Sequence, residues 1–410
     1  MTKPTITCMD RRNFLRIAAA GAAAGMPCVE RTSAQTSLPA RQGESPNLSD
    51  TAVIKDVCRY IANGSTTELP AEVIEKTKHH ILDTFAAIVS GSTLKPGQSA
   101  RKHVEAQGGN AEAQVAASKL LTSAINAAFA NGMMAHSDET DDSHRKTLVH
   151  PGASTVPAAL AMSEKEGADG RTFLRSVVVG YDIGCRIILA LDPNQLLQGS
   201  GATPSIGGCF GAASACAAIA RMDEHLIPFV LSYAAQQASG VNSWMRDKEH
   251  VEKAFVFGGV PARNGVTAVE LVRSGFTSES DPFNGSDNFF KAFSTRPDPS
   301  RLTNGMGREY EVMLTDMKTY SVGSPIQAPT DALLKLIAAG LKPGDMKSLT
   351  VHLPAPGVFT VNDREMPDVN VQYYPGRNTD RRQTDVCDCS LTGTHEGSCG
   401  TRTQATHHPD

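Results

Sequence analysis

Apolar residues recur at helical spacing through most of the region 50–275, and this pattern constrains the fold more than any other feature of the chain. One helix is predicted over residues 70–90, where a buried apolar stripe consists of Val73, Ile74, Thr77, Ile81, Leu82, Phe85 and Ile88. Runs of small residues such as Gly211–Ala215 allow neighbouring helices to approach closely, and aromatic residues make up only 5% of the chain. The sequence therefore predicts a large all-helical domain over residues 46–275.

The pattern changes in the part of the chain that follows. Residues Ser348–Leu353 alternate in polarity and precede a proline, as in a strand. A helix is predicted over Pro329–Ala339, with Gly340 as its C-terminal cap. We therefore expect residues 276–372 to form a small α/β domain. Because the helical domain is much larger, the predicted fold class is mainly α.

The glycine-rich segment Gly207–Gly211 also admits a nucleotide-binding interpretation. A dinucleotide-binding fold requires a strand immediately before such glycines, and none is predicted there. Close packing between helices explains these glycines better.

The first residues of the chain resemble an export signal. Arg11 and Arg12 precede Phe14 and the short apolar stretch Ile17–Met26, and Thr32–Ala34 offers a small-residue cleavage site. We expect residues 1–34 to be a twin-arginine signal peptide and the mature protein to be periplasmic. An ordinary amphipathic N-terminal helix is the alternative, since the apolar stretch is too short to span a bilayer.

Four cysteines, Cys58, Cys185, Cys209 and Cys216, lie in apolar helical contexts. They are predicted to be small core residues and not disulfide partners.

The formal net charge of −4 and the isoelectric point of about 6.3 give no electrostatic reason to expect binding to nucleic acid or to an acidic membrane. No segment reaches the roughly 18 apolar residues that a transmembrane helix needs.

The last part of the chain, residues 374–410, has almost no aliphatic residues. We expect a disordered tail. An out-of-frame translation of what followed Gln372 would also produce such a composition. A metal-binding tract is an alternative, but the spacing is not that of a zinc ribbon for any pair among Cys387, Cys389, Cys399, His395, His407 and His408.

The densest polar cluster occupies residues 135–144 and is followed by His150–Gly152. It lies between two apolar helices, where acidic and imidazole groups are costly to desolvate unless they meet water, a ligand or each other. Crowded carboxylates beside histidines suit acid–base chemistry near neutral pH. A solvated loop with helix caps explains the same residues equally well. A third interpretation is a metal-dependent hydrolase with the ligands His136, Asp141, Asp142 and His144.

At this cluster the sequence resembles the MmgE/PrpD family, whose members include 2-methylcitrate dehydratases and cis-aconitate decarboxylases. The residues that carry the resemblance are the loop at 135–144 and His150-Pro151. The resemblance as a whole runs from about Asp50 to Gln372. Further matching segments are Ile81–Thr84, Gly180–Gly184, Phe210–Ala213, Gln237–Gly240, Lys253–Gly258, Asn288–Phe290 and Lys318–Tyr320.

The resemblance implies a helical domain that carries a smaller α/β lid, a homodimer, and an active site between the two domains. It implies that Glu139, Ser143, His150, Lys253 and Tyr320 belong to the active site, and we predict that Glu139, His150, Lys253 and Tyr320 are catalytic. The predicted substrate-binding set is Asp141, Asp142, Ser143, His144 and Arg263. Arg263 is predicted as an anion anchor from its residue type, and a surface ion pair is the alternative. Neither a metal nor a redox cofactor is implied, and the ligand is a small carboxylate.

Three departures from the family pattern bear on the activity. Many relatives carry a histidine near the position of Ala202 and Thr203, and another where Gln327 stands here. Relatives also continue beyond a segment like 368–373 with apolar helices that return to the main domain, so we expect these closing helices to be missing.

The predicted function is a cofactor-independent lyase, a hydro-lyase of the 2-methylcitrate dehydratase kind or a decarboxylase, which transfers a proton next to a carboxylate. The alternatives are an inactive or purely ligand-binding truncated family member, and the metal-dependent hydrolase.

Overall fold

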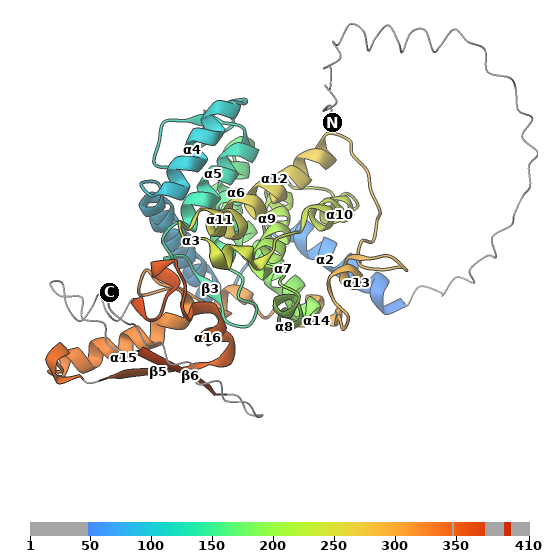
Figure 1. The fold of residues 1–410 in the computed structure, drawn as a ribbon. Coiled ribbons are helices and arrows are strands. Elements are labelled where there is room, and N and C mark those ends of the chain that lie inside the picture. The colour runs from blue at the N-terminus through green and yellow to red at the C-terminus, as the bar shows by residue number, and fades with distance from the viewer. Residues whose placement is uncertain (1–47, 347, 374–388, 395–410) are drawn as a thin grey trace, which may run out of the picture. The chain divides into compact units, whose positions relative to one another are not determined.

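The computed structural model describes residues 48–346, 348–373 and 389–394 (Figure 1). By internal contacts the chain divides into Met1–Ser45 and Pro46–Asp410, and all that follows concerns the second unit. The predicted signal peptide lies outside the described residues, so export stays a prediction.

Most of the described chain is helical, which confirms the predicted fold class. The α-helices are α2 (Leu48–Asn63), α3 (Ala71–Gly91), α4 (Lys95–Gln107), α5 (Ala124–Ala135), α6 (Pro151–Glu166), α7 (Gly170–Leu191), α8 (Pro193–Gln198), α9 (Thr203–Ile219), α10 (Ile227–Gln237), α11 (Val251–Ala254), α12 (Val260–Arg273), α13 (Phe289–Phe293), α14 (Ser300–Thr303), α15 (Gln327–Ala338) and α16 (Ala355–Val361). The short 3-10 helices are η1 (Asn242–Arg246), η3 (Glu311–Leu314), η4 (Ser324–Ile326), η5 (Pro343–Asp345) and η6 (Pro367–Val369), and η2 (Phe255–Gly259) is a π-helical turn.

Helix α3 shows how closely apolar spacing predicts a helix. It begins and ends one residue later than predicted, with Pro70 at its N-terminal cap. One residue of the predicted buried stripe is misplaced, since Leu82 is 67% exposed. The polar residues His80 and Thr84 are fully buried instead, because each forms a hydrogen bond within the protein.

Helices α7 and α9 pack closely at paired glycines. A Cβ atom on Gly184 would lie 2.7 Å from the carbonyl oxygen of Gly207, and one on Gly211 would lie 2.6 Å from that of Gly180. Both distances are too short for a real contact, so the two backbones touch where the side chains are absent. The glycine-rich segment of α9 therefore serves helix packing, as the sequence favours.

The main apolar cluster joins α2, α5, α6, α7, α9, α10 and α12. Cys58, Cys185, Cys209 and Cys216 are buried free thiols, as predicted. Burial is the main reason why the pKa values of Cys58 and Cys209 rise to about 12, so these thiols are unreactive core residues.

The described strands form three small two-stranded pairings. β1 (Ala113–Gln114) pairs antiparallel with β2 (Leu121–Thr122), and β3 (Ser143–His144) pairs antiparallel with β4 (Thr315–Asp316). β5 (Leu349–Pro354) pairs in parallel with β6 (Cys389–Thr394), with Leu349 opposite Cys389. β5 begins one residue after the predicted strand. β6 belongs to the predicted tail, most of which lies outside the described residues, so the tail prediction is not tested.

A second apolar cluster gathers residues from the part of the chain after η3. It contains Val322, Ile326, Val351, Leu353, Val361, Met366, Val369 and Val371. The segment before it packs differently: Phe283, Phe289, Phe290 and Leu302 belong to the main cluster. The composition of the sequence changes at about position 275. The boundary between the two apolar clusters lies later, between Val312 and Val322.

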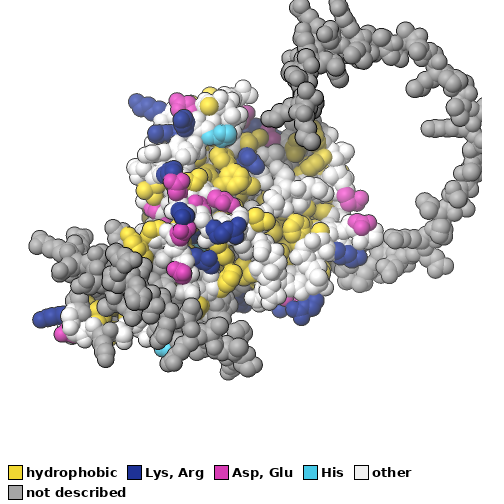
Figure 2. Space-filling model, in the orientation of Figure 1, with side chains coloured by type: hydrophobic (Ala, Val, Ile, Leu, Met, Phe, Trp, Pro, Cys, Tyr) yellow, Lys and Arg dark blue, Asp and Glu magenta, His cyan; other side chains and the backbone are white. Residues whose placement is uncertain are grey.

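On the face of the molecule shown in Figure 2, apolar side chains are interspersed with charged side chains of both signs. Among the described residues, no helix is both long and apolar enough to cross a membrane.

Candidate active site

The polar loop predicted from the sequence joins α5 to α6. His136 caps the C-terminal end of α5, and His150 occupies the N-terminal cap of α6, followed by Pro151 in the first turn. Between them the chain folds back sharply, and Glu139 adopts a left-handed backbone conformation with φ of 58°. This conformation costs about 1 kcal/mol for a residue with a side chain, and such strain is concentrated at functional sites. The turn brings the rings of His136 and His150 to a centroid distance of 5.0 Å.

Asp141 organises the two histidines. Its Oδ2 atom accepts hydrogen bonds from Nδ1 of His136 at 2.7 Å and from Nδ1 of His150 at 3.0 Å. Its Oδ1 atom accepts from Nζ of Lys318 at 3.4 Å. Burial alone would raise the pKa of Asp141, but His136, His150 and Lys318 together hold this pKa well below its usual value. Asp141 is therefore an anion, and it fixes both imidazoles with Nδ1 as the donor and Nε2 as the basic nitrogen.

Glu139 lies between two lysines. Lys253 forms an ion pair with Oε1, and Nζ of Lys318 lies 2.9 Å from Oε2. Glu139 is 1% exposed and Lys253 is 3% exposed, so the pairs are shielded from water. Burial, followed by repulsion from Lys318, holds the pKa of Lys253 well below its usual value. Lys253 therefore gives up its proton more easily than an exposed lysine does.

A π-helical turn shapes the wall behind Lys253. Turn η2 lies between α11 and α12 and places the Phe257 ring against His136, with centroids 4.3 Å apart. The Lys253 ammonium lies 4.9 Å from the centroid of Phe257 and 5.2 Å from that of Trp244. Such turns occur often at functional sites. Here the turn provides aromatic faces that favour a cation.

A cavity of about 160 Å³ opens beside these groups. Its polar lining includes Glu139, Ser143, His150, Thr203, Asn242 and Lys253. Its apolar lining includes Leu148, Leu197, Pro204, Trp244, Met245, Phe257 and Val369, while Gly323–Pro325, Gly357 and Thr360 complete it. The cavity therefore lies where residues of the helical region meet residues of the C-terminal segment, and it has room for a small molecule only.

The structure brings part of the predicted site together. Glu139, Ser143, His150 and Lys253 line the cavity, and Asp141 lies directly behind His150.

Asp142 and His144 of the predicted substrate-binding set form buried hydrogen bonds elsewhere. Asp142 accepts from Nδ1 of His80 and the hydroxyl of Tyr181, both at 2.7 Å. His144 donates from Nε2 to Glu311 at 3.0 Å. The hydrogen bonds of Asp142 and His144 attach the loop to the surrounding helices.

Arg263 and Tyr320 are also placed away from the cavity lining. The Arg263 guanidinium donates to the side-chain oxygen of Asn264 at 3.1 Å and lies over the ring of Phe129. The Tyr320 hydroxyl lies 3.4 Å from Asp331, and its ring packs against the second apolar cluster. Neither residue is among those that line the cavity.

The four residues of the metal-hydrolase interpretation do not converge. His136 and Asp141 are in contact, whereas Asp142 and His144 form their hydrogen bonds with the groups named above. That interpretation is wrong in its ligand set.

Two residues of the site were not predicted. Lys318 is part of the segment that resembles the family, two positions before Tyr320, but only the folded chain shows that its ammonium reaches Glu139. His250 precedes Lys253 by three positions, and its Nε2 atom lies 3.5 Å from Oε1 of Glu139. Both contacts join segments more than 100 residues apart, which no local pattern reveals.

The predicted departure at Gln327 has a structural role. Its side chain forms hydrogen bonds with the backbone of the segment after Lys318. Oε1 accepts from the backbone N–H groups of Thr319 and Tyr320. Nε2 donates to the backbone carbonyls of Tyr320 and Val322. Gln327 thus holds the turn that carries Lys318.

The helical scaffold places a buried carboxylate, paired lysines and aspartate-oriented histidines around a small cavity, and groups of these kinds can bind a small anion and transfer protons. The MmgE/PrpD N-terminal domain model matches residues 55–302, and the chain belongs to this family.

Curated relatives agree with this assignment. A cis-aconitate decarboxylase-like protein, oryM, of Aspergillus oryzae is 24% identical over 300 residues, which are 69% of this chain and 61% of that protein. A cis-aconitate decarboxylase of Aspergillus terreus is 23% identical over 304 residues, 69% of this chain and 60% of that protein. The chain therefore spans about 60% of the length of these relatives. The family is of the lyase type.

Proposed function

We propose that the protein is a lyase that acts on a small carboxylic acid by moving a proton at the carbon next to a carboxylate. The observation that carries the proposal is the Glu139 carboxylate, buried between Lys253 and Lys318 at the wall of a cavity that His150 also lines. Membership of a family whose matched relatives are named cis-aconitate decarboxylases supports the reaction class.

His150 is the candidate base. Because its Nδ1 atom donates to Asp141, the Nε2 atom carries the lone pair, in the arrangement of a base oriented by a carboxylate. Removal of a proton from a carbon next to a carboxylate places additional negative charge on that carboxylate. An ammonium group in a shielded site stabilises this charge far more than it would in water.

Lys253 and Lys318 supply that charge, and Glu139 holds them side by side. The lowered pKa of Lys253 also suits it to release a proton. In a dehydration, that proton would leave with the hydroxyl group as water. In a decarboxylation, it would go to the carbon that loses carbon dioxide. A 2-methylcitrate dehydratase activity is the specific form we propose to test first.

The test is to incubate the purified chain with 2-methylcitrate, citrate or cis-aconitate in D₂O and to follow the acids by proton NMR. We expect loss of one of these acids, with an alkene product or deuterium in place of a carbon-bound proton. The His150→Ala variant should lose both signals, and the exposed His225→Ala variant should keep them. A folded wild-type chain that consumes none of the acids and exchanges no proton would contradict the proposal.

The periplasmic location and the homodimer stay proposals that rest on the sequence resemblance alone.

A further inference from the structure

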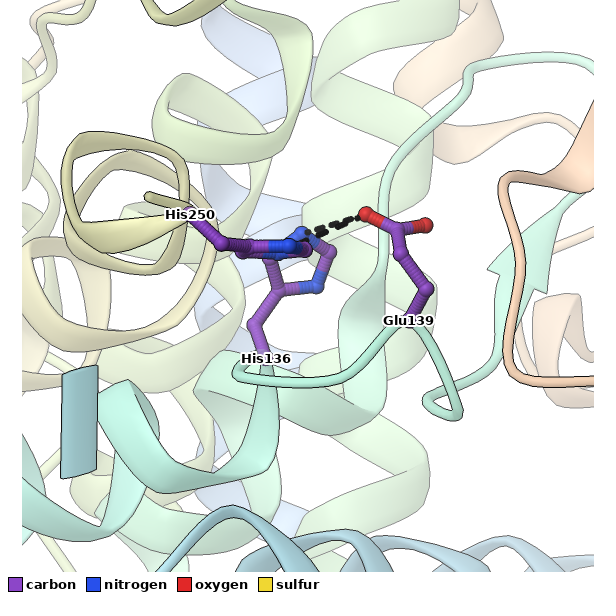
Figure 3. A group of neighbouring side chains, drawn as sticks. All are labelled: His136, Glu139 and His250. Atoms are coloured by element: carbon purple, nitrogen blue, oxygen red, sulfur yellow. Dashed lines mark ion pairs between the residues drawn. The ribbon is translucent and has the colours of Figure 1, made fainter. Parts of the chain in front are cut away.

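Three buried side chains direct ligand atoms toward one another beside the cavity. Figure 3 shows the imidazole of His136 from the end of α5, the carboxylate of Glu139 from the following loop, and the imidazole of His250 from the residue before α11. Nε2 of His136 lies 3.6 Å and Nε2 of His250 lies 3.5 Å from Oε1 of Glu139. The three ligand atoms lie within 4.8 Å of one another, and all three residues are buried.

The protonation of the two histidines follows from their other nitrogens. Nδ1 of His136 donates to Asp141 at 2.7 Å, and Nδ1 of His250 donates to Asp368 at 2.8 Å. A carboxylate only accepts, so each neutral imidazole holds its proton on Nδ1 and its lone pair on Nε2. Carboxylates that hold histidines in this way commonly support metal ligands.

Two of the three facing atoms lack a hydrogen-bond donor. Within the part of the chain that the structure describes, neither Nε2 of His136 nor Nε2 of His250 has a hydrogen-bond partner. Oε1 of Glu139 is paired with the Lys253 ammonium. Buried acceptors without a donor are unfavourable. A cation between the three atoms would satisfy both imidazoles.

The distances fit a transition-metal ion. Bonds of about 2.0–2.2 Å in a tetrahedral site separate neighbouring ligand atoms by roughly 3.3–3.6 Å. The two measured separations from Oε1, 3.5 and 3.6 Å, lie in this interval. We propose that His136, His250 and Glu139 form a binding site for a divalent transition-metal ion of the zinc class. The cavity, which Glu139 lines, provides the open fourth position.

Lys253 is an internal competitor for this site. Its ammonium contacts the same Oε1 atom of Glu139 that the ion would bind. Lys318 pairs with the other oxygen, Oε2, and does not have to move. The Trp244 and Phe257 rings lie close enough to hold the Lys253 ammonium when it leaves Oε1.

The local charge also favours a cation. Glu139, Asp141 and Asp368 contribute three carboxylates, whereas Lys253 and Lys318 contribute two ammonium groups, which leaves one negative charge in excess.

A second trio, His136, Asp141 and His150, is less suitable. Its imidazole nitrogens already donate to one oxygen of Asp141 at 2.7 and 3.0 Å, so no space or lone pair is left between them.

The experiment is a titration of the full-length, chelator-treated protein with Zn²⁺, without substrate, against a chromophoric competing chelator. Residues 374–410 contain cysteines and histidines that are the same in every variant, so zinc bound at the proposed site is counted as the difference from wild type. We expect His136→Ala and His250→Ala each to lose one molar equivalent of tightly bound zinc, and His225→Ala to lose none.

Lys253→Met provides a signature of opposite sign. Removal of the competing ammonium should tighten zinc binding at least tenfold, which a partly unfolded protein would not show. Equal stoichiometry in wild type, His136→Ala and His250→Ala, or unchanged affinity in Lys253→Met, would overturn the proposal. Because no substrate is present, either outcome is independent of the proposed lyase activity.

Discussion

The Glu139 carboxylate is held away from water by two lysines that approach its two oxygens separately. Buried ion pairs contribute little to folding, because the cost of removing the charges from water offsets their attraction. A cluster of this kind, in a strained loop and beside a cavity, is therefore better explained by chemistry than by stability.

Lys318 is the residue whose role is most directly testable. We predict that Lys318→Met lowers kcat/KM by roughly 100- to 1000-fold, because the site loses one of two charges that stabilise the substrate anion. Steady-state kinetics on the first acid found to react would measure this. Lys248→Met is the matched control, since Lys248 and its partner Glu365 are more than 60% exposed. An equal fall in kcat/KM in the two variants would show that Lys318 has no specific role in the site.

Asp83 makes stability depend on pH. Burial, and then repulsion from Asp142 and Asp141, raises the pKa of Asp83 from 3.8 to about 7. Between these values the unfolded chain has lost the proton that the folded chain keeps, so the free energy of unfolding falls as pH rises through this window. Above about pH 7 the folded protein holds a charged Asp83 with one oxygen, Oδ2, that has no hydrogen-bond partner among the described residues.

We predict that Asp83→Asn is stabilising by about 1 kcal/mol or more at pH 8, with allowance for partial exposure, and has a much smaller effect near pH 4. Urea unfolding at the two pH values measures the difference. Asp223→Asn, at an exposed position, serves as control. A gain that is the same at both pH values would show that Asp83 has an ordinary pKa.

At the scale of elements, the contact between α7 and α9 depends on the absence of side chains. We predict that Gly211→Ala destabilises the protein by about 1–3 kcal/mol, because the added methyl group meets the Gly180 carbonyl and must separate the helices. Gly170→Ala, at the exposed start of α7 where a Cβ meets nothing within 4 Å, should be neutral. Urea unfolding compares the two variants, and equal stability would contradict the packing described here.

The elements themselves could be predicted well from local patterns. Apolar spacing placed α3 to within one residue at each end, and the alternating segment before Pro354 placed β5. Such patterns reflect periodic burial, which is a property of a short stretch of chain. They failed at Leu82, because whether one position of an apolar stripe meets the core depends on the neighbouring helix.

The candidate site was less predictable, since its contacts join distant segments. Glu139 and His150 lie in one polar loop and were found from the sequence, but their partners Lys318 and His250 come from segments more than 100 residues away. Tyr320 shares a local motif with Lys318, yet the two side chains have different partners. A motif shows that a segment matters without showing which of its side chains reaches the site.

At the scale of the whole molecule, the cavity is formed jointly. Its charged groups come largely from the helical region, and Gly323–Pro325, Gly357 and Val369 come from the segment with its own apolar cluster. Lys318 is carried by the stretch between the two, where Gln327 holds the backbone in place. The proposed activity therefore requires that both regions keep their places around the cavity.

The measurement that tests the central claim most directly is kcat/KM for His150→Gln relative to wild type. His150 forms no side-chain cap on α6, so its replacement should leave the fold intact, which circular dichroism and thermal unfolding would verify. The proposed role as the base predicts a fall of roughly 100- to 10,000-fold, with His225→Gln unchanged. A folded His150→Gln variant with kcat/KM within threefold of wild type would contradict the account.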